Sequence, residues 1–170
     1  YSVNIEKFYG RQAPLHFDGY KETDKLYDVD YTIEDAKANV KIRLGQSSFR
    51  NAVLANFAFR CCISAISEQS LLVASHIVPW AHNKNYRSDP ANGLCLFVEY
   101  DAYFDKGYFT IDKSLNIVIT DRLDRLSDEL RQRLLILEGK KISRPVATGI
   151  KDDYLDYHRK NIWNKFDETR

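Results

Sequence analysis

The middle of the chain contains two short apolar runs, separated by a polar loop and followed by a pair of acidic residues. The first run, residues 71–74, leads into His76, and the second run, residues 94–97, begins just after Asn92 and Gly93. Apolar runs of this length, bounded by turn residues, are typical of short buried strands. The order therefore predicts a strand, a loop and a second strand, with a histidine at the end of the first strand.

A short helix with two acidic residues is predicted directly after the second strand. Residues 101–107 end in glycine, which commonly closes helices because it tolerates a left-handed backbone. Asp101 and Asp105 are four residues apart, so a helix places them on the same face. Residues 109–111 and 117–119 then flank a polar segment, which predicts a β-hairpin.

Helices are predicted on both sides of this middle region. On the N-terminal side we expect a helix over residues 33–43 that ends at Gly45, and a second helix capped by Ser47. On the C-terminal side a leucine stripe predicts a helix over residues 123–137. We expect a final helix after residue 151, with an aspartate as its cap. Strands in the middle and helices on either side predict an α+β fold.

Length and composition are those of one globular domain. The chain has 170 residues, of which 44% are hydrophobic and 29% are charged. No stretch approaches the ~20 consecutive apolar residues of a membrane helix, and no charged-then-apolar leader opens the chain, so we expect a cytoplasmic protein. Residues 1–31 are rich in aromatic and charged residues without regular periodicity, which predicts an extension of short strands and turns. The domain is then expected over residues 32–170, with its core at 71–111.

The three cysteines do not indicate a disulfide framework or a zinc ribbon. Cys61 and Cys62 are adjacent, and adjacent cysteines rarely bridge because the geometry is strained. Cys95 leaves an odd number, and no CxxC pair occurs. We therefore expect three reduced, mostly buried thiols and no structural zinc.

The net charge of +1, from 25 basic and 24 acidic residues, is low for a protein that binds nucleic acid. It does not exclude such a partner, because contact with phosphates needs only a local basic patch. Methionine is absent and the chain starts at Tyr1, which is typical of a domain taken from a longer protein.

The polar residues of the middle region have the side chains that cleavage of a phosphodiester bond requires. His76 can take a proton from water, since an imidazole with a pKa near ~6.5 is largely neutral in the cell. Asp101 and Asp105 offer hard oxygen ligands to a cation such as Mg²⁺. Asn92 either fixes the tautomer of the histidine or ties down the loop. Each residue alone also has an ordinary interpretation: a packed histidine, surface acids, and an Asn–Gly turn.

Three segments together closely resemble the HNH endonuclease family. More narrowly, they resemble its restriction-type branch, in which the third motif contains Phe-Asp-x-Gly. These segments are residues 74–80, 92–96 and 100–107. The resemblance extends into both flanking helices and covers about residues 40–168. It implies a ββα-metal core flanked by N- and C-terminal helices.

The resemblance implies a role for each residue of the motif. His76 matches the general base, and Asn92 matches the middle asparagine. Asp101 matches the third position, where the family name expects histidine, and a carboxylate there favours Mg²⁺ or Mn²⁺ over Zn²⁺. Asp105 matches a co-ligand or a residue that supports the ligands. Ser75 stands where many members carry a further metal ligand.

The function implied is that of a metal-dependent DNA endonuclease in restriction or defence. Arg87 and Lys106 flank the motif and are expected to hold phosphate oxygens, although ordinary surface charge is an equal interpretation. His158 is expected to pack in its helix rather than react. The alternative is a catalytically weak HNH-like module that binds DNA or a partner protein, suggested by the low net charge and by Ser75. A homodimer or a fused domain is the expected partner.

Overall fold

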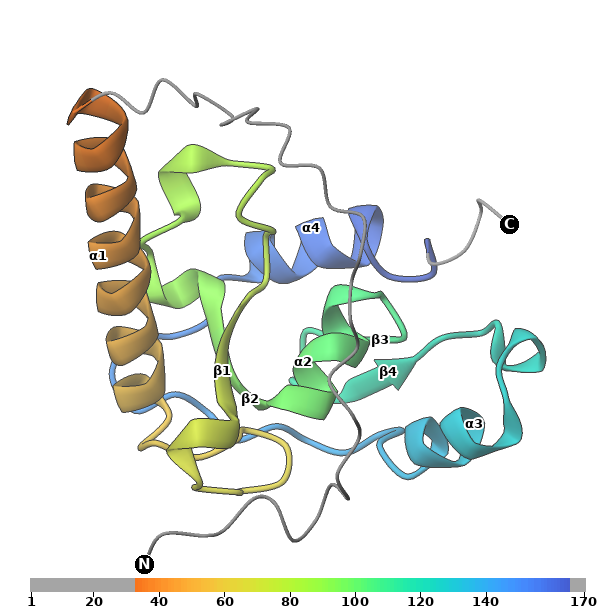
Figure 1. Ribbon diagram of the computed structural model, residues 1–170. Coiled ribbons are helices and arrows are strands. Elements are labelled where there is room, and N and C mark those ends of the chain that lie inside the picture. Colours follow the sequence, from red (N-terminus) through yellow and green to blue (C-terminus); the bar gives the residue numbers. More distant parts are fainter. Residues whose placement is uncertain (1–32, 166–170) are drawn as a thin grey trace, which may run out of the picture. The chain divides into compact units, whose positions relative to one another are not determined.

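Two antiparallel strands and the helix that follows them form the centre of the fold (Figure 1). Strand β1 (Leu72–His76) pairs with β2 (Gly93–Phe97), and helix α2 (Val98–Asp105) follows β2 directly and contacts both strands. The register places His76 opposite Gly93. The predicted order of strand, loop, strand and helix is confirmed, and the fold is an α+β fold with a ββα core flanked by helices.

The computed structural model describes residues 33–165, with side chains from residue 45 onward. The chain divides into units of residues 1–36 and 37–170, and all the side chains considered below belong to the second unit. The extension predicted over residues 1–31 lies outside the described residues. None of the described helices is long and apolar enough to cross a membrane.

Helix α1 (Ile33–Asn56) corrects the prediction of two helices divided near Gly45. A glycine that closes a helix has a positive φ, and Gly45 is not among the glycines with that conformation. A glycine inside a helix costs about 1 kcal/mol relative to alanine, a modest penalty that packing of the rest of the helix can offset. The following turns supply this packing, because Phe49 and Val53 are buried in the core.

Gly93 is a point at which α1 packs closely against the sheet. A Cβ atom added to Gly93 would lie 2.2 Å from Val53 Cγ2 and 3.0 Å from the Phe49 ring. Only glycine lets the helix approach this closely without displacing these side chains. The approach brings Phe49 beside His76, which faces Gly93 across the sheet.

The C-terminal third contains a hairpin and two further helices. Strands β3 (Phe109–Ile111) and β4 (Ile117–Ile119) form the predicted hairpin. Helix α3 (Asp128–Leu135) is shorter than the leucine stripe over residues 123–137 predicts, because Ser127 caps it by accepting a hydrogen bond from the Leu130 backbone. The first part of the stripe forms a separate 3₁₀ turn, Leu123–Arg125.

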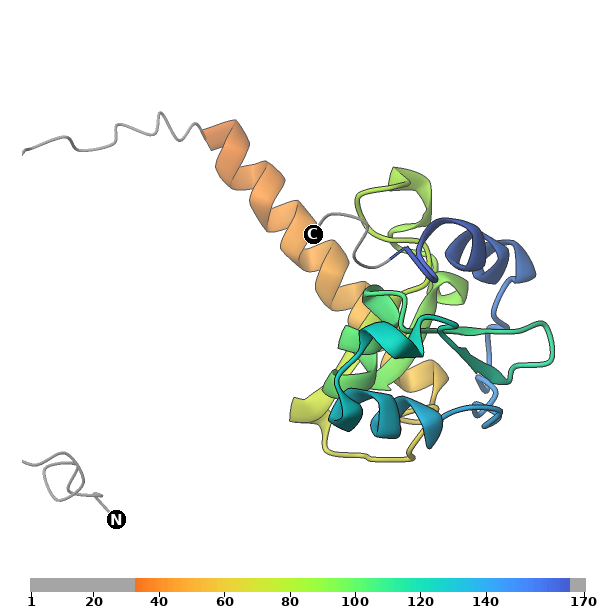
Figure 2. The same ribbon diagram turned by 90° about the vertical axis from the view of Figure 1, so that its right-hand side faces the viewer.

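Helix α4 (Asp152–Asn161) lies along β3 (Figure 2). The prediction that an aspartate caps it is wrong: the cap residue is Lys151, whose side chain makes no capping hydrogen bond. Asp152 and Asp153 lie instead in the first turn, where carboxylates interact favourably with the helix dipole.

His158 of α4 is buried between α2 and β3. Its ring stacks on Phe104 with centroids 3.8 Å apart, its Nε2 donates to the Phe104 carbonyl at 3.1 Å, and its Nδ1 accepts from Thr110 Oγ1 at 2.9 Å. Burial lowers the pKa of His158 to about 4. Both ring nitrogens are therefore occupied, and the packing role predicted for His158 is confirmed.

The three cysteines are buried and unpaired, as predicted. Burial raises the pKa of Cys95 to about 12 and that of Cys62 above its ordinary value. The thiols of Cys62 and Cys95 therefore stay protonated at neutral pH. All three cysteines act as small core residues.

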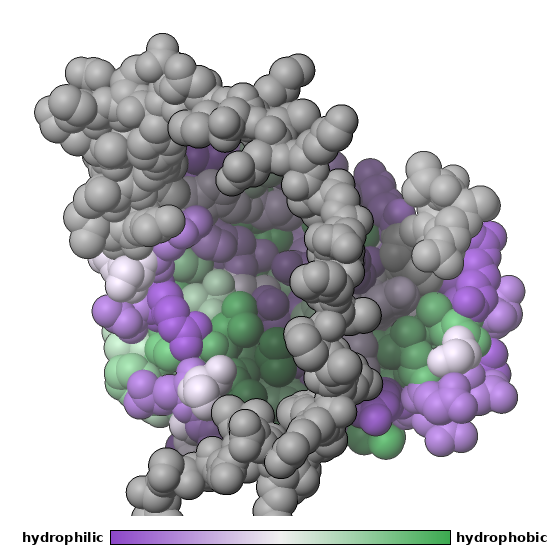
Figure 3. Space-filling model, viewed as in Figure 1, coloured by the Kyte–Doolittle hydropathy of each residue, from purple (hydrophilic) through white to green (hydrophobic). Residues whose placement is uncertain are grey.

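The surface in the view of Figure 1 is divided between two kinds of residue. Figure 3 shows apolar side chains gathered nearer the centre and hydrophilic side chains over most of the right-hand side, where α3 lies. Within α3 and just beyond it, Leu135 and Ile136 are exposed apolar residues.

Candidate active site

His76 is the last residue of β1, and its ring is held between two aromatic side chains. The Phe49 ring from α1 stacks on it, with centroids 3.9 Å apart and planes at 11°. Trp80 approaches it edge-on, at 5.6 Å and 77°. The imidazole is half-buried and fixed in orientation, as a group that accepts a proton in a defined direction must be.

A backbone carbonyl determines which tautomer His76 adopts. Its Nε2 lies 3.0 Å from the carbonyl oxygen of Arg87. A carbonyl can only accept, so Nε2 carries the hydrogen and Nδ1 of the neutral ring keeps its lone pair. Burial lowers the pKa of His76, an effect that the hydrogen bond to Arg87 and the charge of Asp101 partly oppose. The ring is therefore neutral at physiological pH, with Nδ1 ready to accept a proton.

Asn92 ties down the loop and does not orient His76. Its Oδ1 accepts from the Val78 backbone at 2.8 Å, and its Nδ2 donates to the carbonyls of Val78 and Tyr86, both at 3.2 Å. The side chain is buried and joins the start of the loop to its end. The sequence left two roles open for Asn92, and the structure shows that it ties down the loop. The Arg87 carbonyl, and not Asn92, fixes the tautomer of His76.

Helix α4 and the residue before it also hold the loop between β1 and β2, residues 77–92. Asp89 Oδ2 accepts from Lys151 Nζ at 2.6 Å and from the Tyr154 hydroxyl at 2.8 Å. His82 Nδ1 and the Tyr157 hydroxyl are 2.9 Å apart. These contacts fix the segment that carries the Arg87 carbonyl, so α4 supports the orientation of His76 without touching it.

Asp101 and Asp105 of α2 line one cavity with Ser75 and His76, and its volume is about 400 Å³. Burial raises the pKa of Asp101, and the Ser75 hydroxyl and His76 partly oppose that rise. Asp105 is exposed at the rim, yet the protein around its carboxyl raises its pKa to about 6, with repulsion from Asp101 adding to the effect. Two adjacent carboxylates with raised pKa values favour a cation that neutralises both.

The donors that this cavity offers to a divalent cation are the two carboxylates. Neither Asp101 nor Asp105 forms a salt bridge within residues 45–165. Ser75 Oγ is buried beside them and makes no hydrogen bond of standard geometry, although it is close enough to affect the pKa of Asp101. In the described part of the chain no three His, Cys, Asp or Glu side chains are grouped as metal ligands. Mg²⁺ commonly takes one or two carboxylates and completes its shell with water and phosphate.

Both predicted phosphate contacts lie next to the site. The Arg87 guanidinium stands over the Trp80 ring, 4.5 Å from its centroid, and its Nε donates to the Trp80 carbonyl at 2.8 Å. Lys106 ends α2, lines the cavity, and its charge lowers the pKa of Asp105. Of the six residues singled out from the sequence, His76, Asp101, Asp105 and Lys106 line this cavity. Arg87 and Asn92 do not line it and lie in the loop that follows β1.

Comparison with known proteins identifies the family. Residues 61–112 match the sequence family described as HNH endonuclease, a range that contains both strands, the loop and α2. The match confirms, for this segment, the resemblance to the HNH endonuclease family inferred from the sequence motifs.

One solved structure that matches part of the chain is described as a "Modification dependent TagI restriction endonuclease". The identity is 18% and the TM-score 0.41, over 67% of this chain and 37% of that chain. This chain therefore spans little more than a third of that protein's length. No curated protein sequence matches the chain.

Proposed function

We propose that this chain is a metal-dependent DNA endonuclease that hydrolyses phosphodiester bonds. The observation that carries the proposal is the state of His76. Its Nε2 is bound to the Arg87 carbonyl, which leaves Nδ1 unprotonated, and the ring lines the same cavity as a carboxylate pair. A general base and a cation site next to each other are what hydrolysis of a phosphodiester by water requires.

In this proposal His76 Nδ1 takes a proton from the water that attacks phosphorus. The new P–O bond forms as the bond from phosphorus to the 3′ oxygen breaks, and the products carry 5′ phosphate and 3′ hydroxyl ends. The lowered pKa of His76 keeps the base neutral before the reaction. The stacked Phe49 ring and the Arg87 carbonyl keep Nδ1 in one direction during it.

Asp101 and Asp105 would hold the divalent cation, Mg²⁺ or Mn²⁺. When bound, it supplies positive charge that stabilises the phosphate and the departing oxygen. Lys106, at the rim of the cavity, and Arg87, on Trp80, are placed to hold other phosphate oxygens of the strand. Asn92 acts as a positioning residue through the loop.

The test is cleavage of supercoiled plasmid DNA with Mg²⁺ or Mn²⁺. We expect His76→Ala to lower the rate by about 10²- to 10⁴-fold, the usual contribution of a general base. Glu129→Ala is the control, since Glu129 is exposed on α3 and does not line the cavity. Undiminished cutting by His76→Ala would show that the base is misassigned.

A second candidate is a DNA- or partner-binding module that does not cut. The observation that favours it is Ser75, which stands where many relatives carry a ligand, so the described residues offer two carboxylates and no third protein ligand. DNA binding by the wild-type chain without cleavage in Mg²⁺, Mn²⁺ or Ca²⁺ would establish this function instead.

We further propose that residues 32–170 form the nuclease domain, with its core at 71–111, and that it serves restriction or defence in the cytoplasm. A single site cuts one strand at a time, so cleavage of both strands favours a homodimer or a fused partner domain. Light scattering after gel filtration, with and without a DNA duplex, measures the oligomeric state. A monomer that makes double-strand breaks in a single binding event would contradict the dimer.

A further inference from the structure

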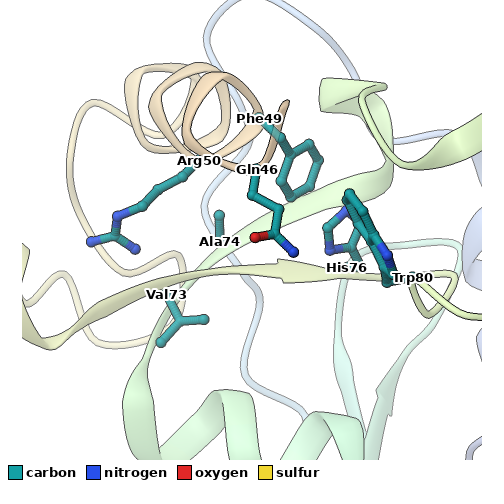
Figure 4. A pocket seen from close by; sticks show the side chains of 7 residues that line it. All are labelled: Gln46, Phe49, Arg50, Val73, Ala74, His76 and Trp80. Atoms are coloured by element: carbon teal, nitrogen blue, oxygen red, sulfur yellow. The ribbon is translucent and has the colours of Figure 1, made fainter. Parts of the chain in front are cut away.

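A second cavity lies beside the carboxylate cavity, between α1 and β1 (Figure 4). Its volume is about 270 Å³, and α1 supplies Gln46, Phe49 and Arg50 to its wall. Four residues line both cavities: Val73, Ala74 and His76 of β1, and Trp80. Among the described strands β1 pairs only with β2, so its other edge is unpaired there. The two cavities are therefore neighbouring compartments along one strand.

The two compartments differ in chemistry. The first contains two carboxylates and Lys106, which suit a phosphate and its cation. Among residues 45–165, the second is lined by no carboxylate, and the one cation that lines it is engaged. Arg50 Nη1 donates to the Leu72 carbonyl at 2.8 Å, and Nη2 donates to the Gln69 carbonyl at 3.0 Å. Aromatic side chains and an amide remain, which are the groups that bind nucleobases rather than phosphates.

Gln46 is a polar residue available to a ligand in this compartment. Its side chain is exposed and makes no hydrogen bond to any other side chain or backbone group of residues 45–165. Figure 4 shows its amide directed across the cavity toward His76. A primary amide offers both donors and an acceptor, and the edge of every base presents complementary groups.

We propose that this second cavity is a nucleobase subsite. It takes the base of the nucleotide that adjoins the scissile phosphate, with Trp80 as the aromatic wall and Gln46 as the hydrogen-bonding group. This inference rests on the proposed nuclease function, which places the phosphate beside Asp101 and Asp105. A base in the cavity cannot remain stacked in a duplex, so the enzyme prefers an unpaired nucleotide at this position.

The test compares two single strands that carry equal charge. One is fluorescein-labelled oligothymidylate of twelve nucleotides, and the other is an abasic strand with the same number of phosphates. Binding to the whole chain is measured by fluorescence anisotropy in EDTA, which prevents cleavage. We expect the thymidylate strand to bind about 5- to 150-fold more tightly, as expected for stacking of a base on an aromatic side chain.

Variants of α1 test whether the second cavity causes the difference in affinity between the two strands. We expect Gln46→Leu, which keeps the size of the side chain, to weaken thymidylate binding by about 2- to 10-fold, the value of one hydrogen bond, and to weaken binding of the abasic strand by less than that. Ser48→Ala is the control, since Ser48 is exposed on the same helix but does not line the cavity. It should change neither affinity.

Two results would overturn the subsite: equal binding of both strands by the wild-type chain, or a Gln46→Leu variant that weakens both strands equally or neither. The plasmid assay separates this inference from the nuclease proposal. A chain that discriminates between the strands but cuts no plasmid keeps the subsite and loses the nuclease. A chain that cuts plasmid but does not discriminate keeps the nuclease and loses the subsite.

Discussion

His76 and His158 lie in different regions of this molecule, but their rings have similar surroundings. His76 and His158 each stack on a phenylalanine, at 3.9 Å and 3.8 Å, and each has Nε2 beside a backbone carbonyl, at 3.0 Å and 3.1 Å. Burial lowers the pKa of both. They differ at Nδ1, because Thr110 occupies it in His158, whereas His76 borders two cavities.

In the proposed function, the comparison explains why His76 is reactive and His158 is not. Stacking and the carbonyl fix the ring and its tautomer in both regions, and only the environment of the second nitrogen differs. Around His158 that nitrogen completes a link between α4 and β3. Around His76 it is left for a ligand, with Asp101 and Asp105 across the cavity.

The largest expected effect is the difference between the two alanine variants: removal of His76 should impair cleavage, and removal of His158 should impair stability. His76→Ala should lower plasmid cleavage by about 10²- to 10⁴-fold while the protein stays folded. His158→Ala should instead lower the free energy of unfolding by about 3 kcal/mol, the cost of emptying a buried ring site. Cleavage rates and urea denaturation of both variants measure this. A His158→Ala variant that stays as stable as wild type would break the comparison.

The pH dependence of stability should report on His158. The unfolded chain takes up this proton near pH ~6.5, but the folded chain does so only near a pKa of about 4. Stability is therefore lost as pH falls from 6.5 to 4, by about 3 kcal/mol in total. The difference between wild type and His158→Gln in urea denaturation over this range isolates the effect from other groups. Parallel pH curves for the two proteins would contradict it.

The Gly93→Ala variant tests whether the close packing of α1 on the sheet orients His76. Gly93→Ala places a methyl group 2.2 Å from Val53 Cγ2, so we expect a loss of about 1–3 kcal/mol in stability. Cleavage should fall as well, because Phe49 must shift from the His76 ring. Gly149→Ala is the control, since nothing lies within 4 Å of its Cβ position. Equal stability of the two variants would show that the packing adjusts freely.

The smallest expected effect concerns the carboxylate pair. Asp101→Asn should weaken Mg²⁺ binding by at least about 10-fold, as measured by calorimetry. Asp105 has a pKa of about 6, so Mg²⁺ binding to wild type should also weaken as pH falls below 6. Asp128→Asn, on the surface of α3, serves as the control. Unchanged Mg²⁺ affinity in Asp101→Asn would remove the cation site from α2.

The sequence predicts the features of this site that depend on local spacing. The two strands, the loop and the pair at Asp101 and Asp105 follow from short apolar runs and an interval of four residues. The sequence does not reveal the Arg87 carbonyl, because every residue has one and only the loop conformation directs it. The stacking of Phe49 on His76 depends on α1 meeting Gly93, a tertiary contact. The helix end expected at Gly45 is absent, because the presence of a glycine does not by itself determine the backbone angle φ at that residue.

The proposed reaction requires His76 to be a neutral imidazole with hydrogen on Nε2 and a free Nδ1. Nitrogen-15 NMR of the histidine side chains, at neutral pH and without metal, measures this directly. We expect a protonated shift for Nε2 of His76 and an unprotonated shift for Nδ1, and His76→Ala identifies the signals. A His76 ring that carries hydrogen on Nδ1, or on both nitrogens, at neutral pH would contradict the assignment of Nδ1 as the base.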